Sequence, residues 1–519
     1  MFNLYIRILT YILKISSPPR LICILRSDLH IMVPVIVIFI SVYFPLFTQA
    51  QTGPAGIGNS TNNVLWLRSD QGTSTTTNGE AIEQWLDISG NDNHANQTDA
   101  GKRPEFVTTS INGIPALRFG GNNINLVVND NDNLDNTTGL SILVVARPDN
   151  IDTQPRGLVG KRASQSSGVA YALFTYNNRY LYFDSPGRNN GTTAATNDPQ
   201  IFSAVYDGTT GNPRARIFQQ GVQTGSGNSG TSIGNMESDL YIGILNDNYG
   251  HGFRGDMSEV IIYRSALNRA QRLIVETYLA NRYDINMGPA GYSSTTHNED
   301  FTGIGHAGGY KHSATANMGS GILLAELNGS LNETNEFVFT GHDDTPHGID
   351  NSNLPAIPEV NLDDRWQRIY YIERVQDGVI DGGTTDIRIG FDFDGTGIIP
   401  SANRSYYLLY RSGTSGEFSV VAGGSSAVSN NQVWFDIANA NFASGYYTLV
   451  RTDQEIKSWY SFNDRDWDNP EAWSTNPDIY QNPASEIPGA MDRVVIQGSK
   501  VITVKNNNLL ANILEVNSG

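Results

Sequence analysis

The sequence predicts an all-β protein built from several sandwich-like modules. Three observations favour this fold class: short alternating apolar and polar runs recur along the chain, turn residues separate them, and charged residues are sparse. The 519 residues include 52 Gly and 21 Pro, and only 17% are charged. Such a composition excludes coiled coils and long helical bundles. At roughly 150 residues per domain, the length allows about three domains.

The charge balance is acidic. The chain has 34 Lys and Arg residues against 52 Asp and Glu residues, a formal net charge of −18. A surface of this sign repels phosphate backbones, and the sequence has no basic cluster to offset it. We therefore expect no nucleic-acid partner.

The N-terminus predicts export. Residues 32–48 form an apolar run of the length typical of a signal peptide, and Thr48-Gln49-Ala50 has the small residues of a cleavage site. We predict a signal peptide over residues 1–50, with Met32 as a possible true start and an uncleaved membrane anchor as the alternative. Cleavage would remove Cys23, the single cysteine, and leave no stable membrane span. The expected location is secreted or on the outer cell surface, without disulfides.

Residues 51–285 form the first predicted module. Short strand-like runs are separated by Gly, Asn and Asp turns, which is typical of an antiparallel sandwich or jelly roll. The strands expected here include residues 140–146, 180–183, 201–206, 215–218, 240–244 and 257–263.

One helix is predicted near the end of this module, over residues 268–282. Asn268 stands at the N-cap position and Gln271 follows three residues later, as a capping box requires. One stripe of the helix should pack against the sandwich. Its members are Ala270, Ile274, Thr277, Tyr278 and Asn281.

Several motifs of the first module together resemble a laminin-G-like, concanavalin A-like domain. They cover residues 64–70, 85–95, 103–106, 111–119 and 253–263, the last followed by the predicted helix. Domains of this type are common in large multidomain surface proteins of Bacteroidetes. The resemblance implies a jelly-roll sandwich with one C-terminal helix, in which Trp66 and Trp85 belong to the core.

Residues 286–453 form a second predicted β-sandwich. The motif order resembles the sandwich that often follows a laminin-G-like domain in those surface proteins, for which no activity is implied. The expected strands cover residues 321–327, 336–340, 366–372, 387–391, 406–410 and 445–450.

Residues 454–519 have a different pattern. Residues 467–473 and 488–496 resemble the opening of modules that wind into a right-handed β-solenoid. Three short strands are expected at residues 494–496, 501–504 and 513–516. Because so few rungs cannot bury their own faces, we expect a truncated, incomplete β-solenoid-like segment that continues further in a longer version of the protein.

The motifs of catalysis are mostly missing. Glycoside hydrolases with a concanavalin A-like fold would require Glu-x-Asp-x-x-Glu on one strand, but after Glu237 and Asp239 the third position is Ile242. The run Gly230-Thr-Ser-Ile-Gly234 matches a nucleophile-elbow pattern without the strand and helix that such an elbow needs. We therefore predict a protein that is not an enzyme.

Calcium is the cofactor that the loops could bind. Residues 129–135 and 246–250 are rich in Asp and Asn, which supply the oxygen ligands that calcium prefers but which are also common turn residues. A further acidic loop has Asp87 with Asn91 and Asn93. The candidate ligands are Asp130, Asp132, Asp135 and Asp247.

A second metal hypothesis concerns histidine. The run His342-Asp-Asp-Thr-Pro-His347 could supply imidazole and carboxylate ligands, and the alternative is a polar loop that follows a strand.

Exposed aromatic rings are the candidate ligand contacts, because sugar rings stack on tyrosine and tryptophan faces. The candidates in the first module are Tyr176, Tyr180, Tyr182 and Tyr249. The sequence thus predicts a secreted or surface non-catalytic protein for adhesion or carbohydrate binding, with a glycan or surface protein as partner. Two alternatives stay open: the binding portion of a secreted polysaccharide-processing glycoside hydrolase, and a structural spacer of a surface fibre.

Overall fold

The computed structural model describes residues 53–517, except residues 122, 136, 150–152, 164–167, 178–179, 247–249, 288–290, 316–318, 358–360, 402–403, 426–427, 453–456, 478–485, 490–491, 499 and 506–512. The predicted signal peptide and its cleavage site lie outside the described residues. Within the described ranges, no helix is both long and apolar enough to cross a bilayer.

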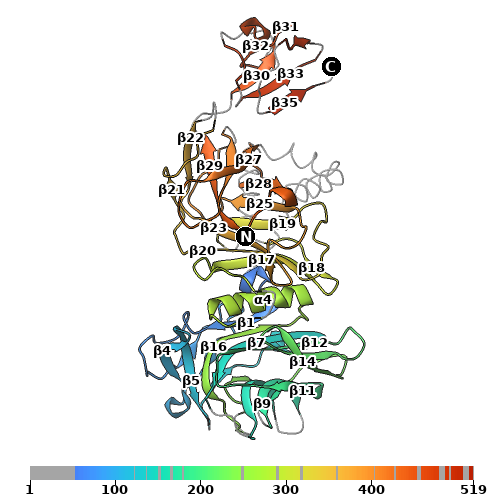
Figure 1. Ribbon diagram of the computed structural model, residues 1–519. Coiled ribbons are helices and arrows are strands. Elements are labelled where there is room, and N and C mark those ends of the chain that lie inside the picture. Colours follow the sequence, from blue (N-terminus) through green and yellow to red (C-terminus); the bar gives the residue numbers. More distant parts are fainter. Residues whose placement is uncertain are drawn as a thin grey trace, which may run out of the picture. The chain divides into compact units, whose positions relative to one another are not determined.

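The first sandwich consists of two antiparallel sheets of eight strands each (Figure 1). Sheet A has the order β14 (Val222–Gly227), β13 (Ala215–Gln219), β12 (Gln200–Asp207), β7 (Gly139–Pro148), β16 (Arg254–Tyr263), β5 (Ile114–Gly120) and β4 (Glu105–Ile111), and β1 (Asn63–Arg68) also pairs with β16. Sheet B has the order β11 (Gly187–Ala194), β10 (Tyr180–Ser185), β9 (Val169–Tyr176), β8 (Arg156–Arg162), β15 (Leu240–Ile242), β6 (Leu126–Val128), β3 (Ala95–Asn96) and β2 (Gln84–Trp85).

Every second side chain along the strands points inward, and these side chains form the core between the two sheets. Leu173 and Phe183 of sheet B and Ile142 and Val144 of sheet A belong to one buried cluster. Trp85 lies in this cluster, whereas Trp66 is buried on the outer side of sheet A. The prediction that both tryptophans are core residues is confirmed.

The predicted helix is confirmed as α4 (Arg269–Arg282), with the capping box formed. Asn268 Oδ1 accepts a hydrogen bond from the Gln271 amide at 3.0 Å, and Gln271 Oε1 accepts one from the Asn268 amide at 3.2 Å. These bonds satisfy amide groups that a helix start otherwise leaves unpaired.

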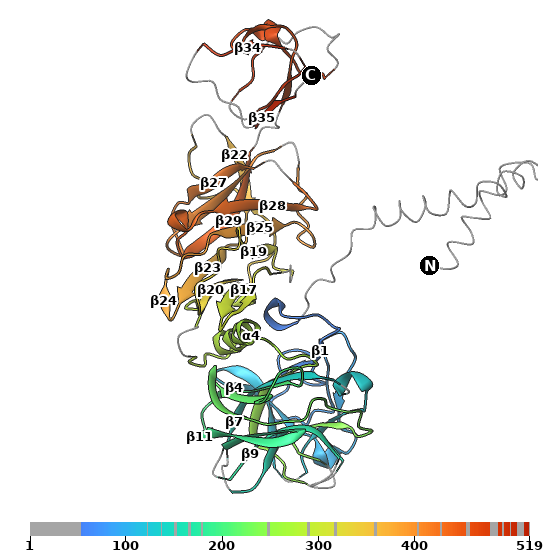
Figure 2. The same ribbon diagram turned by 90° about the vertical axis from the view of Figure 1, so that its right-hand side faces the viewer.

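The single apolar stripe predicted for this helix is incomplete. Residues outside it, among them Leu273, Val275 and Leu279, are also buried, because the second sandwich packs on the side of α4 that faces away from sheet A. Figures 1 and 2 both show α4 between sheet A and β17 (Glu299–Ala307). The side-chain amide of Asn281 donates to the Ser294 carbonyl at 2.7 Å across this contact.

In the second sandwich a large sheet packs against a small one, and buried residues of both sheets form its core. The large sheet contains β17 with β18 (Tyr310–His312), β20 (Glu336–His342), β23 (Tyr370–Gln376), β29 (Gly445–Thr452), β22 (Leu362–Trp366), β21 (Ile349–Asp350), β24 (Val379–Ile380), β26 (Tyr406–Arg411) and β27 (Ser419–Ser425). The small sheet is β19 (Ile322–Glu326), β25 (Ile387–Asp392) and β28 (Gln432–Ile437).

The strand predicted over residues 366–372 is wrong as a single element. β22 ends at Trp366 and β23 begins at Tyr370. The Thr448 hydroxyl lies within hydrogen-bond distance of the Trp366 and Arg368 carbonyls, at 3.0 and 3.1 Å. β22 and β23 both pair with β29, and the register shifts between Arg365–Val450 and Tyr370–Tyr447, so the predicted strand is interrupted at residues 367–369. The buried Arg368 guanidinium there donates to the Thr345 and Ser320 carbonyls.

The C-terminal strands pair in parallel. β30 (Ser458–Ser461), β33 (Arg493–Ile496) and β35 (Ile513–Val516) lie side by side in one sheet, with β32 (Trp473–Ser474) at its edge, and β31 (Arg465–Asp466) pairs with β34 (Ile502–Thr503). Parallel stacking agrees with the β-solenoid prediction, which stays a prediction. Short 3-10 helices occur at Pro54–Gly56, Ala100–Lys102, Asp132–Leu134, Asn439–Asn441 and Pro470–Ala472.

Candidate functional site

Three of the four candidate tyrosines lie together on the outer face of sheet B. Alternate residues of β9 and β10 point into the core, so the residues between them point outward. Tyr176 and Tyr180 are directly opposite in the antiparallel pairing, and Tyr182 is opposite Phe174. The fourth candidate, Tyr249, lies outside the described residues.

The rings of this face contact one another. The Phe174 and Tyr182 ring centroids are 5.4 Å apart with nearly parallel planes, and those of Tyr176 and Tyr182 are also 5.4 Å apart. Phe174 is buried, whereas Tyr176, Tyr180 and Tyr182 are each half-buried. Rings held by neighbours but still accessible on one side can stack against a flat apolar ligand surface.

A charged pair lies next to the rings. The Arg188 guanidinium donates two hydrogen bonds to Asp184, at 2.7 and 2.8 Å, and lies 5.5 Å from the centre of the Phe174 ring. Arg162 approaches the same carboxylate at 3.4 Å. Asp184 is buried but the Arg188 side chain is 53% exposed, so donor groups are presented beside the aromatic surface. We call the set Phe174, Tyr176, Tyr180, Tyr182, Asp184 and Arg188 the tyrosine face.

A loop borders the tyrosine face. The chain around Leu245 packs on the outer side of β8, and Leu245 joins the same apolar cluster as Phe174. Gly160 permits this close approach, since a Cβ atom there would lie 2.4 Å from the Leu245 carbonyl oxygen. The candidate metal ligand Asp247 lies outside the described residues.

The first acidic loop surrounds a lysine. The Lys161 ammonium is completely buried and contacts the carboxylates of Asp130 and, at 3.3 Å, Asp135. It also donates to the Ser238 carbonyl at 2.6 Å. Burial raises the pKa of Asp135, although Lys161 opposes the shift. Asp132 is exposed in a short 3-10 turn beside this cluster.

The other candidate metal loops have protein partners as well. The two Asp87 carboxylate oxygens accept hydrogen bonds from the amides of Trp66, Ser89 and Asn93 and from the Ser89 hydroxyl. His342 lies 3.0 Å from Asp300, and His347 lies 3.0 Å from the Arg368 guanidinium. In the described part of the chain, no group of three or more His, Cys, Asp or Glu side chains is placed to hold a metal ion. Calcium binding stays a prediction.

The enzyme-like motifs lie apart from the tyrosine face. Glu237 is exposed, the Asp239 carboxylate accepts a hydrogen bond from the Asp130 amide at 2.9 Å, and Ile242 is buried in the core. Ser232 lies in an exposed loop between β14 and β15. It therefore lacks the strand-to-helix turn that a nucleophile elbow uses.

The sheet order, the outward tyrosines and the closing helix allow comparison with known families. Residues 119–271 match the concanavalin A-like lectin/glucanases superfamily. The match runs from β5 into α4, so the concanavalin A-like domain predicted from the sequence motifs is confirmed in this part of the chain. The matched segment contains the whole tyrosine face. No curated protein matches the sequence significantly.

Solved structures match this chain at low similarity. Domain 4 of AbnA, a GH43 extracellular arabinanase from Geobacillus stearothermophilus in complex with arabinotriose, is 15% identical with a TM-score of 0.30, over 40% of this chain and 96% of that chain. Trypanosoma rangeli sialidase in complex with sialic acid is 16% identical with a TM-score of 0.31, over 50% of this chain and 40% of that chain. The CBM40 of Ruminococcus gnavus IT-sialidase, bound to alpha2,3 sialyllactose, is 10% identical with a TM-score of 0.23, over 26% of this chain and 80% of that chain.

The sequence reasoning missed the charged half of the tyrosine face. Asp184 and Arg188 are brought opposite each other by the tight hairpin between β10 and β11. Pro186-Gly187 at its centre is a recognisable turn sequence that could have revealed the pairing. β11 itself was hard to predict, because its residues, GRNNGTTA, are typical of a loop.

Proposed function

We propose that the concanavalin A-like domain binds carbohydrate on the tyrosine face, and that the chain is a non-catalytic binding protein of the cell exterior. The observation that supports this most directly is the contact of partly exposed rings with an arginine–carboxylate pair. Aromatic faces match the apolar side of a sugar ring, while guanidinium and carboxylate groups bond its hydroxyls. The matched superfamily contains both lectins and glucanases.

The charges on this face favour binding over hydrolysis. Glycoside hydrolysis requires two carboxyl groups that flank the scissile bond. Within the described part of the tyrosine face, the carboxylate is Asp184, and Arg188 and Arg162 engage it. The binding portion of a polysaccharide-processing enzyme remains the second candidate, and release of reducing sugar by the purified full chain would favour it.

A glycan array followed by calorimetric titration of the full chain tests the proposal. Tyr182→Ala should weaken binding of the selected glycan about tenfold or more, because the central ring contacts both Phe174 and Tyr176. Tyr460→Ala is the matched control, since Tyr460 is a half-buried tyrosine on β30. Unchanged affinity in Tyr182→Ala, with the fold intact, would contradict the proposal. The absence of any glycan ligand would favour the spacer role.

Export is a separate part of this proposal and has its own measurement. N-terminal sequencing of the protein secreted by its host should begin at Gln51. An N-terminus at Met1 or Met32 on membrane-bound protein would instead support the anchor alternative.

A further inference from the structure

A pocket distinct from the tyrosine face lies on the other side of the first sandwich. It has a volume of about 410 Å³ and opens between the outer face of sheet A, the start of α4 and β18. This volume lies within the range of about 300–1,000 Å³ that is usual for small-molecule sites.

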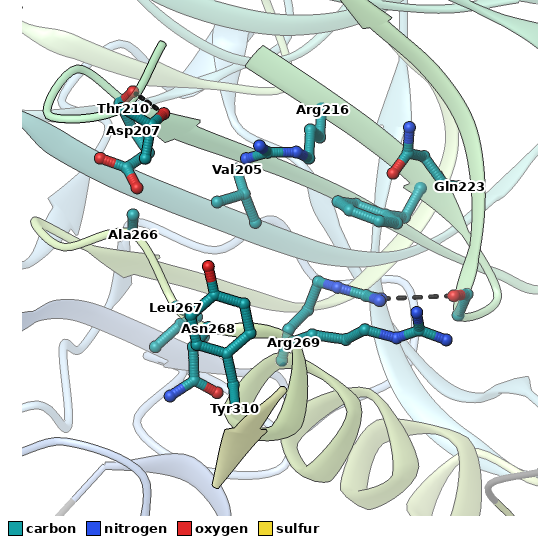
Figure 3. A pocket seen from close by; sticks show the side chains of 13 residues that line it. Val205, Asp207, Thr210, Arg216, Gln223, Ala266, Leu267, Asn268, Arg269 and Tyr310 are labelled. Carbon is teal, nitrogen blue, oxygen red and sulfur yellow. Dashed lines mark hydrogen bonds between the residues drawn. The ribbon is translucent and has the colours of Figure 1, made fainter. Parts of the chain in front are cut away.

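The cationic side chains of the pocket come from both of its walls. Figure 3 shows Arg216 and Gln223 on the side of sheet A, with Arg269, Asn268 and Tyr310 on the side of the helix. A third arginine, Arg272, forms part of the lining. Three guanidinium groups around one pocket are unexpected in a chain with 34 basic and 52 acidic residues.

Two of these arginines have no carboxylate partner. In the described part of the chain, the half-buried side chain of Arg216 has no hydrogen bond or ion pair, and the exposed guanidinium of Arg269 donates only to the amide oxygen of Asn335, at 3.4 Å. Arg272 differs, because it is buried, pairs with Glu276 and lies 3.7 Å from the centre of the Phe218 ring. The positive charge of Arg216 and Arg269 is therefore available to a ligand.

The remaining lining suits a hydroxyl-rich molecule. Tyr310 is 55% exposed and gives the pocket an aromatic wall. Asp207, Thr210 and Gln223 supply hydrogen-bond acceptors and donors. Guanidinium groups bind carboxylates and other oxyanions with strong, charge-assisted hydrogen bonds.

We propose that this pocket is a second binding site, which takes a negatively charged saccharide unit with Arg216 and Arg269 on its anionic group. The carboxylate of a uronic acid and a sulfate ester have the oxyanion chemistry required. This site is independent of the tyrosine face, so either one can be wrong without the other.

The test is calorimetric titration of the full chain with three probes: trigalacturonate, a sulfated galactose oligosaccharide and the neutral galactotriose. We expect one or both anionic probes to bind, and galactotriose to bind much more weakly. In the double variant Arg216→Ala/Arg269→Ala, the affinity for the anionic probe should fall by roughly tenfold or more for each arginine removed. The two anionic probes distinguish carboxylate from sulfate recognition.

Two control variants complete the design. Arg388→Ala removes a half-exposed arginine of the second sandwich that pairs with Asp436, and it should bind as the unmodified chain does. Tyr182→Ala should also retain anion binding, because it alters only the tyrosine face. Equal affinity of the double variant and the unmodified chain, with unchanged melting temperature, would overturn the proposal. So would failure of both anionic probes to bind, or binding of galactotriose as tight as that of the anionic probes in Tyr182→Ala, where the tyrosine face is altered.

Discussion

A buried lysine lies where the sequence predicts a calcium ion. Lys161 has no exposed side-chain surface and contacts the carboxylates of Asp130 and Asp135. One ammonium supplied by the chain itself thus offsets the negative charge that a metal ion would otherwise offset. A sequence pattern of acidic loop residues cannot distinguish the two cases, because the lysine comes from β8, which is distant in sequence.

Removal of this ammonium should be costly. In Lys161→Met, Asp135 would remain buried without its cation, so we expect the free energy of unfolding to fall by about 3–5 kcal/mol in urea titrations. Lys457→Met is the control, because Lys457 forms an exposed ion pair with Glu486 and should change stability by about 1 kcal/mol or less. The calcium prediction has its own measurement in the unmodified chain: a lower melting temperature in chelator would support it, and an unchanged melting temperature would contradict a metal that stabilises the fold.

His312 should make the protein sensitive to acid. Burial lowers the pKa of His312 from 6.5 to about 4. Between these values the unfolded chain binds the proton and the folded chain does not, so stability is retained above pH 6.5 and decreases as the pH falls toward 4. The loss approaches about 1.4 kcal/mol per pH unit for this one group.

Urea titrations at pH 7 and pH 4.5 measure this effect. His312→Leu should show a smaller decrease in stability between the two pH values than the unmodified chain does. His306→Leu, at a half-buried histidine on β17, should retain the decrease of the unmodified chain. An identical pH dependence in His312→Leu and the unmodified chain would refute the assignment.

At the scale of elements, the sequence predicts what local patterns determine. The helix was predictable because Asn268 and Gln271 form a capping interaction within one turn. Strands such as β7 and β12 were predictable from continuous apolar runs. β11 was not, because its polar residues become a strand only through pairing with β10. The division of residues 366–372 into β22 and β23 likewise depends on Thr448, which is distant in sequence.

The two candidate sites also differ in how far local sequence patterns predict them. Tyrosine spacing of two along β10 predicts that Tyr180 and Tyr182 share a face, and Tyr176 joins them through the hairpin. The pocket that Arg216, Arg269 and Tyr310 line was not predictable, since its lining comes from β12, β13, β14, α4 and β18. Only the packing of the second sandwich beside α4 brings Tyr310 to the same space as Arg216.

At the scale of the whole molecule, the two sandwiches share one apolar cluster. It contains Ile201 and Ile261 of the first sandwich, Leu273 and Leu279 of α4, and Phe337 of the second. An interface that buries apolar residues of both sandwiches stabilises the two sandwiches jointly. We therefore expect the two sandwiches to unfold as one cooperative unit.

Truncation tests this coupling. A chain of residues 51–285 should expose one side of α4, and we expect a lower melting temperature and aggregation compared with residues 51–452. Size-exclusion chromatography and thermal unfolding measure both properties. The matched control is residues 51–452 compared with the full chain, where the first transition should be unchanged. Equal melting temperatures for the short and long chains would contradict joint stabilisation.

The burial of α4 on two sides also restricts how such proteins can be rearranged. A cut near residue 285 leaves α4 with the first sandwich, yet it separates this helix from the packing partners that the second sandwich supplies. Recombination that exchanged the second sandwich alone would have to preserve a surface complementary to this helix. We therefore expect a transplanted first sandwich to be stable only when the second sandwich, or another surface complementary to α4, accompanies it.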